Sequence, residues 1–176
     1  MTAAHLILAL VAGQRLAELV YGERNARALK RQGAYEVGHR HYPLLVLLHA
    51  TWLVAMWIQL PRQPVIDGPL IGAFAALQIA RYWVIASLGR YWTTRIVTLP
   101  DAPLVRRGPY RFLRHPNYVI VVGEIALLPM AFGQVGTAIV FSVLNLALLG
   151  WRIRVEEATL ATRRGLKPTG VVLPAP

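Results

Sequence analysis

The sequence predicts a single-domain, all-α protein (residues 1–176) that crosses the membrane with about five helices. Three observations support this fold class. Hydrophobic residues make up 56% of the chain and charged residues 15%, whereas soluble domains carry roughly 25% charged residues. Several stretches without Asp, Glu, Lys or Arg are long enough to span a bilayer. The basic residues gather in alternate connections between these stretches, as in polytopic membrane proteins.

The first three predicted segments precede the middle of the chain. Residues 3–21 form the least apolar segment, in which Arg15 and Glu18 are three positions apart and are expected to pair on one helix face. The second segment, 41–61, contains no Asp, Glu, Lys or Arg. The third, 69–88, is interrupted by a single arginine. Each of these segments is therefore predicted as one membrane crossing.

The fourth and fifth segments are expected to form a helical hairpin. The run 125–151 is uncharged but contains Pro129 and the sequence Gly133-Gln-Val-Gly136. These residues favour a tight turn between two helices over one long span. The helices are predicted at 116–132 and 137–151.

Two charges inside these segments need an explanation, because a charge at the bilayer centre costs roughly 2.5–3.5 kcal/mol. Arg81 stands beside two aromatic residues, and we expect its side chain to snorkel toward the interface. Glu124 lies about two turns into the fourth segment. It could pair with Arg81 or Arg95, or face a cavity, and the sequence leaves these alternatives open.

The charge distribution predicts the orientation in the membrane. With five crossings, 16 of the 19 Lys and Arg residues fall on one side. This asymmetry predicts an N-terminus outside and a C-terminus in the cytoplasm. The net charge of +11 then indicates contact with the headgroups of membrane lipids rather than nucleic acid. The oligomeric state stays open, because the motif Gly68-Pro-Leu-Ile-Gly72 is weak evidence for a dimer face.

Several kinds of site are excluded or not expected. The chain has no cysteine, which excludes disulfides, thiolate catalysis and Cys-ligated metals. His39 and His41, with Glu36 as the nearby carboxylate, are too sparse to predict a metal site. Residues 167–176 contain three prolines and are expected to form an irregular tail.

The connection into the fourth segment carries the clearest signal of function. It reads Leu104-Val-Arg-Arg-Gly-Pro-Tyr-Arg-Phe-Leu-Arg-His-Pro-Asn-Tyr118, and its Gly-Pro pair predicts a turn. Pro116 suits the first position of a helix, which makes His115 the candidate N-cap. A helix start among arginines attracts anions, and Tyr110 and Tyr118 could face a cation or a flat ring. The simpler alternative is a basic loop that contacts lipid phosphates.

A second cluster follows the fifth segment, in Trp151-Arg-Ile-Arg-Val-Glu-Glu-Ala-Thr-Leu160. On a continuing helix, Arg152 would pair with Glu156 at i+4 and Arg154 with Glu157 at i+3, which alone predicts a surface salt-bridge ladder. Both clusters, however, emerge on the same side of the membrane. We therefore expect one Arg, two Glu, one His and two Tyr residues to converge on a pocket at the membrane edge.

These residues resemble a known family. Gly108-Pro-Tyr-Arg-x-x-Arg-His-Pro-Asn-Tyr118, followed about 34 residues later by Arg152-x-x-x-Glu-Glu157, is similar to the paired motifs of the isoprenylcysteine carboxyl methyltransferase family. The amino-terminal half resembles small bacterial members more loosely, through Gln14-Arg-Leu-Ala-Glu-Leu19, Arg24-Asn25 and Gly33-Ala-Tyr-Glu-Val-Gly-His-x-His-Tyr42. Some members of that branch act on long-chain alkylpyrones or related phenolic lipids.

The resemblance implies an enzyme that uses S-adenosylmethionine, with a cofactor-binding and catalytic region at 90–160 on the cytoplasmic edge of the membrane. Glu156 would meet a cationic group of the cofactor, and the helix start at Pro116 its carboxylate. Arg152 would be the catalytic residue that binds the nucleophilic oxygen of the substrate. Secondary candidates are Glu157, Glu124 and Arg114. The implied cofactor contacts are Pro103, Leu104, Val105, Tyr110, His115, Pro116, Asn117, Tyr118 and Glu156.

The predicted reaction is O-methylation of the carboxylate or acidic hydroxyl of a lipophilic substrate, such as an alkylpyrone, a phenolic lipid or an isoprenylcysteine-like carboxylate. Family members often close the site with a Tyr-containing stretch, but residues 161–176 contain no aromatic residue. One alternative is N-methylation of an amine lipid, which would require a base such as His115 or Glu157. Another is a non-enzymatic transporter or assembly subunit whose basic loops bind lipid headgroups.

Overall fold

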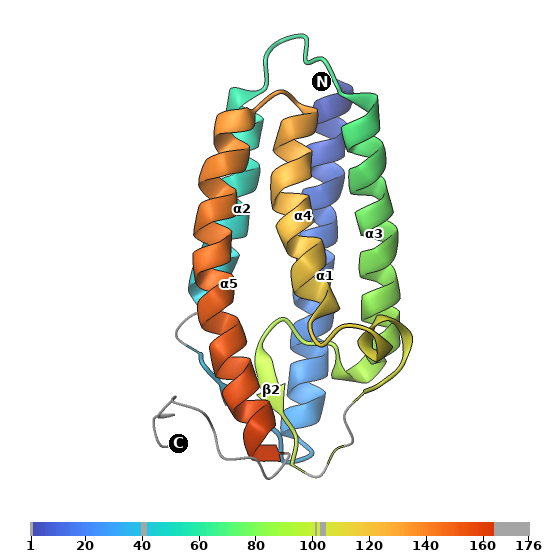
Figure 1. The fold of residues 1–176 in the computed structure, drawn as a ribbon, viewed down its shortest axis with the longest axis vertical. Coiled ribbons are helices and arrows are strands. Elements are labelled where there is room, and N and C mark those ends of the chain that lie inside the picture. Colours follow the sequence, from blue (N-terminus) through green and yellow to red (C-terminus); the bar gives the residue numbers. More distant parts are fainter. Residues whose placement is uncertain (1, 40–41, 101, 103–104, 164–176) are drawn as a thin grey trace.

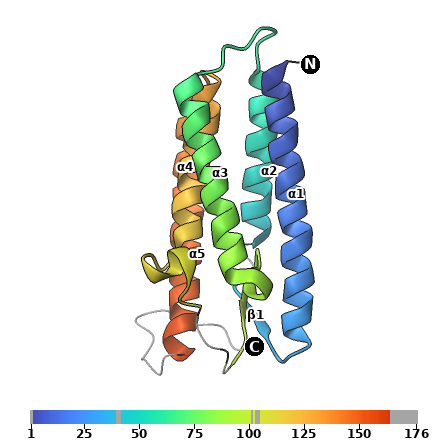
Figure 2. The ribbon, with the colours of Figure 1, turned by 90° about the vertical axis from the view of Figure 1, so that its right-hand side faces the viewer.

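Five helices form an up-and-down bundle in the computed structural model, which describes residues 2–39, 42–100, 102 and 105–163 (Figures 1 and 2). They are α1 (Ala3–Lys30), α2 (Tyr42–Gln59), α3 (Gly68–Leu88), α4 (Pro116–Ala131) and α5 (Val135–Arg163). In this described part of the chain, α1, α2, α3 and α5 are long and apolar enough to cross a membrane, whereas α4 has only 16 residues. The predicted all-α membrane fold is confirmed.

The helix boundaries follow local signals. Helix α3 begins after Asp67, whose side chain accepts a hydrogen bond from the backbone N–H of Leu70 at 2.9 Å, as an N-cap residue does. Helix α1 extends nine residues beyond the predicted end at position 21, and basic residues in its last turn suit the negative end of the helix dipole. Its polar last third was not predicted as helix, because it lies outside the apolar stretch.

The predicted helical hairpin is present in α4 and α5. Helix α4 ends at Ala131, and Gly133 adopts φ 71°, a left-handed conformation that glycine allows at the end of a helix. Helix α5 then runs without interruption to Arg163, well past the predicted end of the apolar segment at 151. The second polar cluster therefore extends the membrane helix.

A small sheet, which the sequence analysis did not predict, joins two connections at one end of the bundle. Strand β1 (Tyr35–Val37) follows α1, and β2 (Ile96–Thr98) follows the short helix η1 (Gly89–Tyr91); the two strands pair antiparallel. A further short helix, η2 (Gly108–Arg111), precedes α4. These elements cover the end of the bundle at which α1, α3 and α5 finish (Figure 1).

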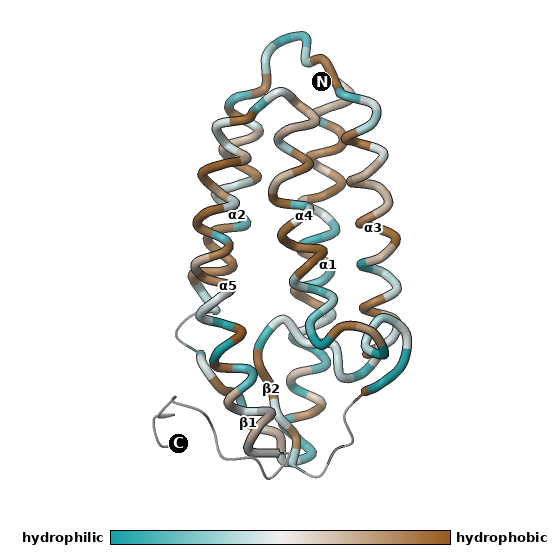
Figure 3. Tube along the Cα trace, in the orientation of Figure 1, coloured by the Kyte–Doolittle hydropathy of each residue, from teal (hydrophilic) through white to brown (hydrophobic). Residues whose placement is uncertain are grey.

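Hydrophobic packing fills the opposite part of the bundle. Trp52, Met56 and Leu128 are almost completely buried there. They belong to a cluster of buried and partly buried hydrophobic side chains to which all five α-helices contribute. Hydropathy along the chain follows the same division: brown stretches dominate the helices, and hydrophilic colours gather at the end with β2 and in the α2–α3 connection (Figure 3). The body of the bundle is thus apolar, and the end that carries the sheet and the two short helices is polar.

Four charged side chains form a closed ring inside the bundle, which we call the charge ring: Arg15, Glu18, Arg81 and Glu124. Glu18 contacts Arg15 at 3.0 Å and Arg81 at 2.8 Å, and Glu124 contacts the same two arginines at 3.0 and 3.1 Å. The predicted Arg15–Glu18 pair is confirmed, and of the partners considered for Glu124 the correct one is Arg81. Arg95 instead contacts Glu36.

The expectation that Arg81 snorkels to the interface is wrong. Arg81 is 4% exposed, and its guanidinium contacts Glu18 and Glu124 from two other helices. Pairing on both sides removes the need to reach water, because a buried charge is tolerated when it is paired and hydrogen-bonded. The contact with Glu18 was not predicted, because the two residues are 63 positions apart in the sequence.

Candidate functional site

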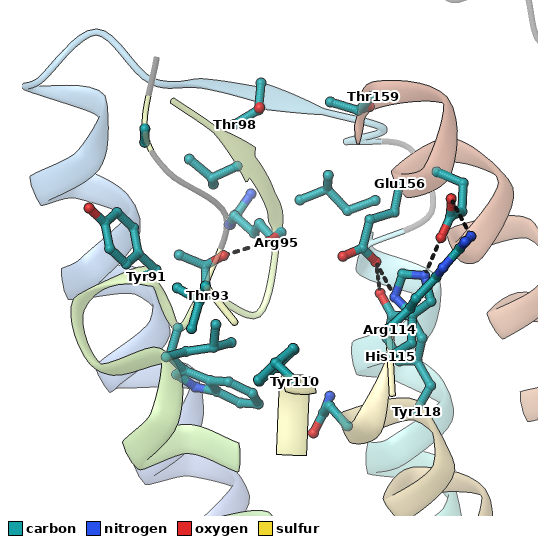
Figure 4. Close-up of a pocket in the computed structure, with 18 of the residues that line it drawn as sticks. Tyr91, Thr93, Arg95, Thr98, Tyr110, Arg114, His115, Tyr118, Glu156 and Thr159 are labelled. Carbon is teal, nitrogen blue, oxygen red and sulfur yellow. Dashed lines mark hydrogen bonds and ion pairs between the residues drawn. The ribbon is translucent and has the colours of Figure 1, made fainter. Parts of the chain in front are cut away.

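A cavity of about 630 Å³ lies at the end of the bundle that carries the sheet (Figure 4). Three parts of the chain line it: residues of 88–99, which include β2; residues of 102–118, which lead into α4; and the stretch of α5 from Arg152 to Thr159. We call this cavity the pocket. Its volume is within the range of roughly 300–1,000 Å³ that small-molecule and cofactor sites occupy.

Tyr118 is the centre of a polar network on one wall of the pocket. Its hydroxyl donates a hydrogen bond to Oε2 of Glu156 and accepts one from Nε of Arg152 at 2.9 Å. Tyr118 lies in the first turn of α4, whereas Arg152 and Glu156 lie one turn apart on α5. The packing of α4 against α5 therefore brings the two predicted clusters together.

Arg152 is fixed at two points of its guanidinium. Nε donates to the Tyr118 hydroxyl, and Nη2 donates to the backbone carbonyl of Thr94 at 2.9 Å. An arginine has five N–H donors, so the group retains donors for an anionic ligand. The predicted Arg152–Glu156 pair does not form directly; the Tyr118 hydroxyl lies between the two charges.

His115 stands at the N-cap position of α4, as predicted, but its side chain makes no capping hydrogen bond. Its Nε2 donates to Oε1 of Glu157 at 2.7 Å, and its ring stacks on Tyr118 with centroids 5.2 Å apart. Arg114 approaches the same carboxylate at 3.9 Å. Glu157 thus pairs with the loop before α4, and the predicted pair with Arg154 is wrong.

Tyr110 faces the pocket from η2 (Figure 4). Burial raises the pKa of its hydroxyl, and the negative charge of Glu156 raises it further. The phenol therefore stays neutral at physiological pH and can donate a hydrogen bond. The turn that places it requires glycine at position 108, where φ is 57° and a Cβ would collide with the side chain of Ser87.

One wall of the pocket lies within the predicted region 90–160, but none of its residues was named from the sequence as a contact of the cofactor or substrate. Tyr91, Trp92, Thr93 and Arg95 line it, followed by β2 and Leu99. The run Thr93-Thr-Arg-Ile-Val-Thr98 is rich in β-branched residues, which is a signal for a strand. Its shortness and its place beside an arginine-rich loop hid that signal.

The structure brings most of the predicted site residues to the pocket. Pro116 is buried at the start of α4 without lining the cavity, and Glu124 belongs to the charge ring. Pro103 and Leu104 lie outside the described residues, as does the predicted tail. The predicted residues that line the pocket are Val105, Tyr110, Arg114, His115, Asn117, Tyr118, Arg152, Glu156 and Glu157.

Comparison with known proteins yields a family and two bacterial relatives. The sequence model of the isoprenylcysteine carboxyl methyltransferase (ICMT) family matches residues 70–162. A protein of Bacillus subtilis (strain 168), named uncharacterized protein YpbQ, is 38% identical over 161 residues, which cover 88% of this chain and 95% of the relative. An uncharacterized protein of Haemophilus influenzae is 27% identical over 164 residues, which cover 89% and 94%. No solved structure matches the chain significantly.

Proposed function

The chain belongs to the isoprenylcysteine carboxyl methyltransferase family, and on that premise we propose that it is an S-adenosylmethionine-dependent O-methyltransferase of an acidic, lipophilic substrate. Family membership implies a membrane methyltransferase in general. The finer assignment rests on the pocket. The observation that carries it is the placement of an anion, Glu156, and a cation, Arg152, on one pocket wall with the Tyr118 hydroxyl between them.

The residues of the pocket fit the proposed cofactor. Its ammonium and sulfonium groups call for a carboxylate, and Glu156 uses one oxygen for Tyr118 while a carboxylate can accept about four hydrogen bonds. Its flat adenine ring and its cationic sulfonium can both contact aromatic rings, and Tyr110 and Trp92 are aromatic residues of the pocket lining. When bound, S-adenosylmethionine supplies a methyl group on a sulfonium; the acceptor oxygen forms the new O–C bond while the C–S bond breaks and its electron pair stays on sulfur.

The protein side chains then orient the reactants and balance charge. Arg152 would hold the anionic oxygen of the acceptor, because Thr94 and Tyr118 occupy only part of its donor set. A carboxylate or acidic hydroxypyrone is already ionised near neutral pH, so no proton has to be removed. Alignment of two bound reactants can lower the barrier by as much as about 7–11 kcal/mol. The pocket can therefore work without a strong general base.

We further propose that the pocket faces the cytoplasm of a bacterial inner membrane. Arg95, Arg106, Arg111 and Arg114 all line it, and basic residues are enriched in cytoplasmic connections. The acceptor would then enter from the inner leaflet, with its lipid tail among the helices and its acidic head in the pocket. Long-chain alkylpyrones, phenolic lipids and isoprenylcysteine-like carboxylates are the acceptor classes that meet this description.

N-methylation of an amine lipid is the second candidate, and the His115–Glu157 pair favours it. The hydrogen bond from Nε2 to Glu157 leaves Nδ1 of a neutral imidazole as an acceptor, which could take a proton from an ammonium group.

Methyl transfer to defined acceptors tests these proposals. The purified protein in detergent receives methyl-labelled S-adenosylmethionine and, in separate reactions, a long-chain alkyl hydroxypyrone, an alkylphenol, a farnesyl thioether carboxylate or phosphatidylethanolamine. We expect a methyl ester or ether of one acidic acceptor by mass spectrometry. Label on phosphatidylethanolamine alone would support the second candidate, and absence of label in every acceptor would contradict both.

A further inference from the structure

Helix α1 approaches the pocket wall closely at Gly22. A Cβ added to Gly22 would lie 2.9 Å from the backbone nitrogen of Thr94 and 3.0 Å from its Cγ2. Backbone atoms move aside at a higher cost than the end of a flexible side chain. Only glycine at position 22 therefore permits the observed distance between α1 and the chain at Thr94.

Two side chains on the same face of α1 hold the turn that precedes Thr94. The amide Nδ2 of Asn25 donates to the carbonyl oxygens of Trp92 at 2.8 Å and Gly89 at 3.2 Å. The Tyr21 hydroxyl donates to the same Gly89 carbonyl at 3.2 Å. Residues three and four positions apart lie on one side of a helix, so these side chains and Gly22 form one surface, which we call the α1 platform.

The segment held by the α1 platform also holds Arg152. The Thr94 carbonyl accepts the hydrogen bond from Nη2 of Arg152, while the Tyr118 hydroxyl accepts the one from Nε. The long side chain of arginine has considerable rotamer freedom, so two fixed acceptors are needed to define its position. One acceptor comes from α4, and the other lies in the segment that α1 contacts, where the Tyr42 hydroxyl also forms a hydrogen bond with Oγ1 of Thr94 at 3.1 Å.

We propose that the α1 platform, and Asn25 in particular, positions Arg152 for the methyl acceptor by way of the Thr94 carbonyl. This inference rests on the proposed function, since it assigns a purpose to the geometry of Arg152. It adds to the site a part of the chain outside residues 70–162, where the family match lies. Asn25 is a positioning residue, because it does not itself line the pocket and acts on Arg152 only through the segment that contains Thr94.

A matched pair of glycine variants tests the close approach. Gly22→Ala should push Thr94 away and lower kcat about tenfold to a hundredfold, as misplacement by about 1 Å can do. Gly13→Ala is the control on the same helix, because a Cβ there meets no atom within 4 Å. The control should keep the kcat of the wild type. Equal kcat values for both variants would overturn the proposal.

A double-mutant cycle tests whether Asn25 acts through Arg152. Asn25→Leu should lower kcat about tenfold in the wild type but less than about twofold in Arg152→Met, because methionine has no N–H donor for the Thr94 carbonyl or the Tyr118 hydroxyl. The affinity for S-adenosylhomocysteine should change less than about threefold, since Arg152 contacts the acceptor. An equal loss of kcat in both backgrounds, or a parallel loss of affinity for S-adenosylhomocysteine, would overturn the proposal in favour of a purely structural role.

Hydrogen exchange separates this inference from the proposed function. Peptides that cover residues 89–98 should exchange faster in Asn25→Leu and Gly22→Ala than in Gly13→Ala, whether or not the protein transfers methyl groups. Unchanged exchange in all three variants would overturn the positioning role alone. Failure of the wild type to bind S-adenosylhomocysteine, with faster exchange in the first two variants, would overturn the proposed function and leave the link from α1 to Thr94 in place.

Discussion

The molecule contains two clusters of Arg and Glu residues that differ in how their charges are satisfied. In the charge ring, each carboxylate contacts both arginines, and the side chains of Glu18 and Glu124 are 10% and 3% exposed. In the pocket, Glu156 is 27% exposed and bonds to a neutral hydroxyl. The four charges of the ring therefore balance one another inside the bundle. The comparison teaches that charges which lie at a cavity and are not balanced by each other, rather than the mere presence of charges near a membrane, mark the functional site.

Additional hydrogen bonds strengthen this distinction. Gln14 donates to Glu18 at 3.1 Å, and Gln78 donates to Glu124 at 2.7 Å, so the ring is surrounded by donors from α1 and α3. A buried ionic network is tolerated when its charges are paired, and each of the four charges here contacts two charges of opposite sign. We therefore expect substitutions in the ring to affect folding and substitutions in the pocket to affect activity.

The largest effect is expected from breaking the charge ring. Arg81→Met leaves two buried carboxylates with a single arginine, and should lower the free energy of unfolding by about 3–5 kcal/mol. The double variant Arg81→Met/Glu124→Met keeps the neutral Arg15–Glu18 pair and should recover most of that loss. Denaturant unfolding in detergent micelles measures both. If Arg81→Met were as stable as the wild type, the mutual pairing of the four charges would not be needed for folding, which would contradict this account of the ring.

Removal of the positive charge of Arg152 should lower activity strongly and change stability only slightly. Arg152→Ala is expected to lower kcat about 100-fold, as loss of a donor to a charged oxygen does. The free energy of unfolding should change by about 1 kcal/mol, because the side chain contributes two hydrogen bonds and borders a cavity. Kinetics with the acceptor found in the methyl-transfer assay provide the first value. Full activity of this variant would contradict the anionic-acceptor mechanism.

Tyr118→Phe is a milder change in the same network. It keeps the ring that stacks on His115 but removes the hydroxyl that joins Arg152 to Glu156. We expect about a tenfold loss in kcat/KM, the size of one hydrogen bond to a charged group. The variant should unfold at nearly the temperature of the wild type, which would show that Tyr118 acts in the pocket and not in folding. A loss of stability as large as that of Arg81→Met would contradict this assignment.

The smallest effect concerns a third cluster, at the sheet. Burial acts to raise the pKa of Glu36, but hydrogen bonds and charges from Lys30 and Arg95 outweigh it and hold the pKa below the ordinary value of 4.5. A lowered pKa stabilises the fold above the unfolded-state pKa, and this stability is lost as the pH falls through the folded-state value. The difference in melting temperature between wild type and Glu36→Gln should therefore be present near neutral pH and shrink well below pH 4.5. A difference that grows on acidification would contradict this assignment.

Much of the fold could be predicted because the bilayer imposes a simple rule. Apolar runs of sufficient length, with at most one charged residue each, marked α2, α3 and the α4–α5 hairpin to within a few residues at most ends. The last third of α1 was missed because its residues are mostly polar; Asn25, for example, hydrogen-bonds to the carbonyl oxygens of Gly89 and Trp92. The strands were missed because three residues are too short for a periodic pattern.

The site was predictable where local motifs and topology act together. The two clusters had to emerge on the same side of a five-helix protein, and α4 packs against α5 as a hairpin. Contacts between distant positions were not predictable from one sequence. Arg81 pairs with Glu18 across 63 positions, and Arg152 reaches the Thr94 carbonyl across 58. Because of the first contact, Arg81 is buried although it was predicted to reach the interface. The second contact connects Arg152 to a pocket wall whose residues were not predicted.

Isothermal titration of S-adenosylhomocysteine into the detergent-solubilised wild type and Glu156→Gln tests the central claim most directly. If the pocket holds the methyl donor, the wild type should bind, and the neutral variant should bind about tenfold or more weakly, since a hydrogen bond to a charged group contributes about 1.5–3 kcal/mol. The two proteins should unfold at similar temperatures. No binding to the wild type, or equal affinity in both proteins, would contradict the assignment of this pocket.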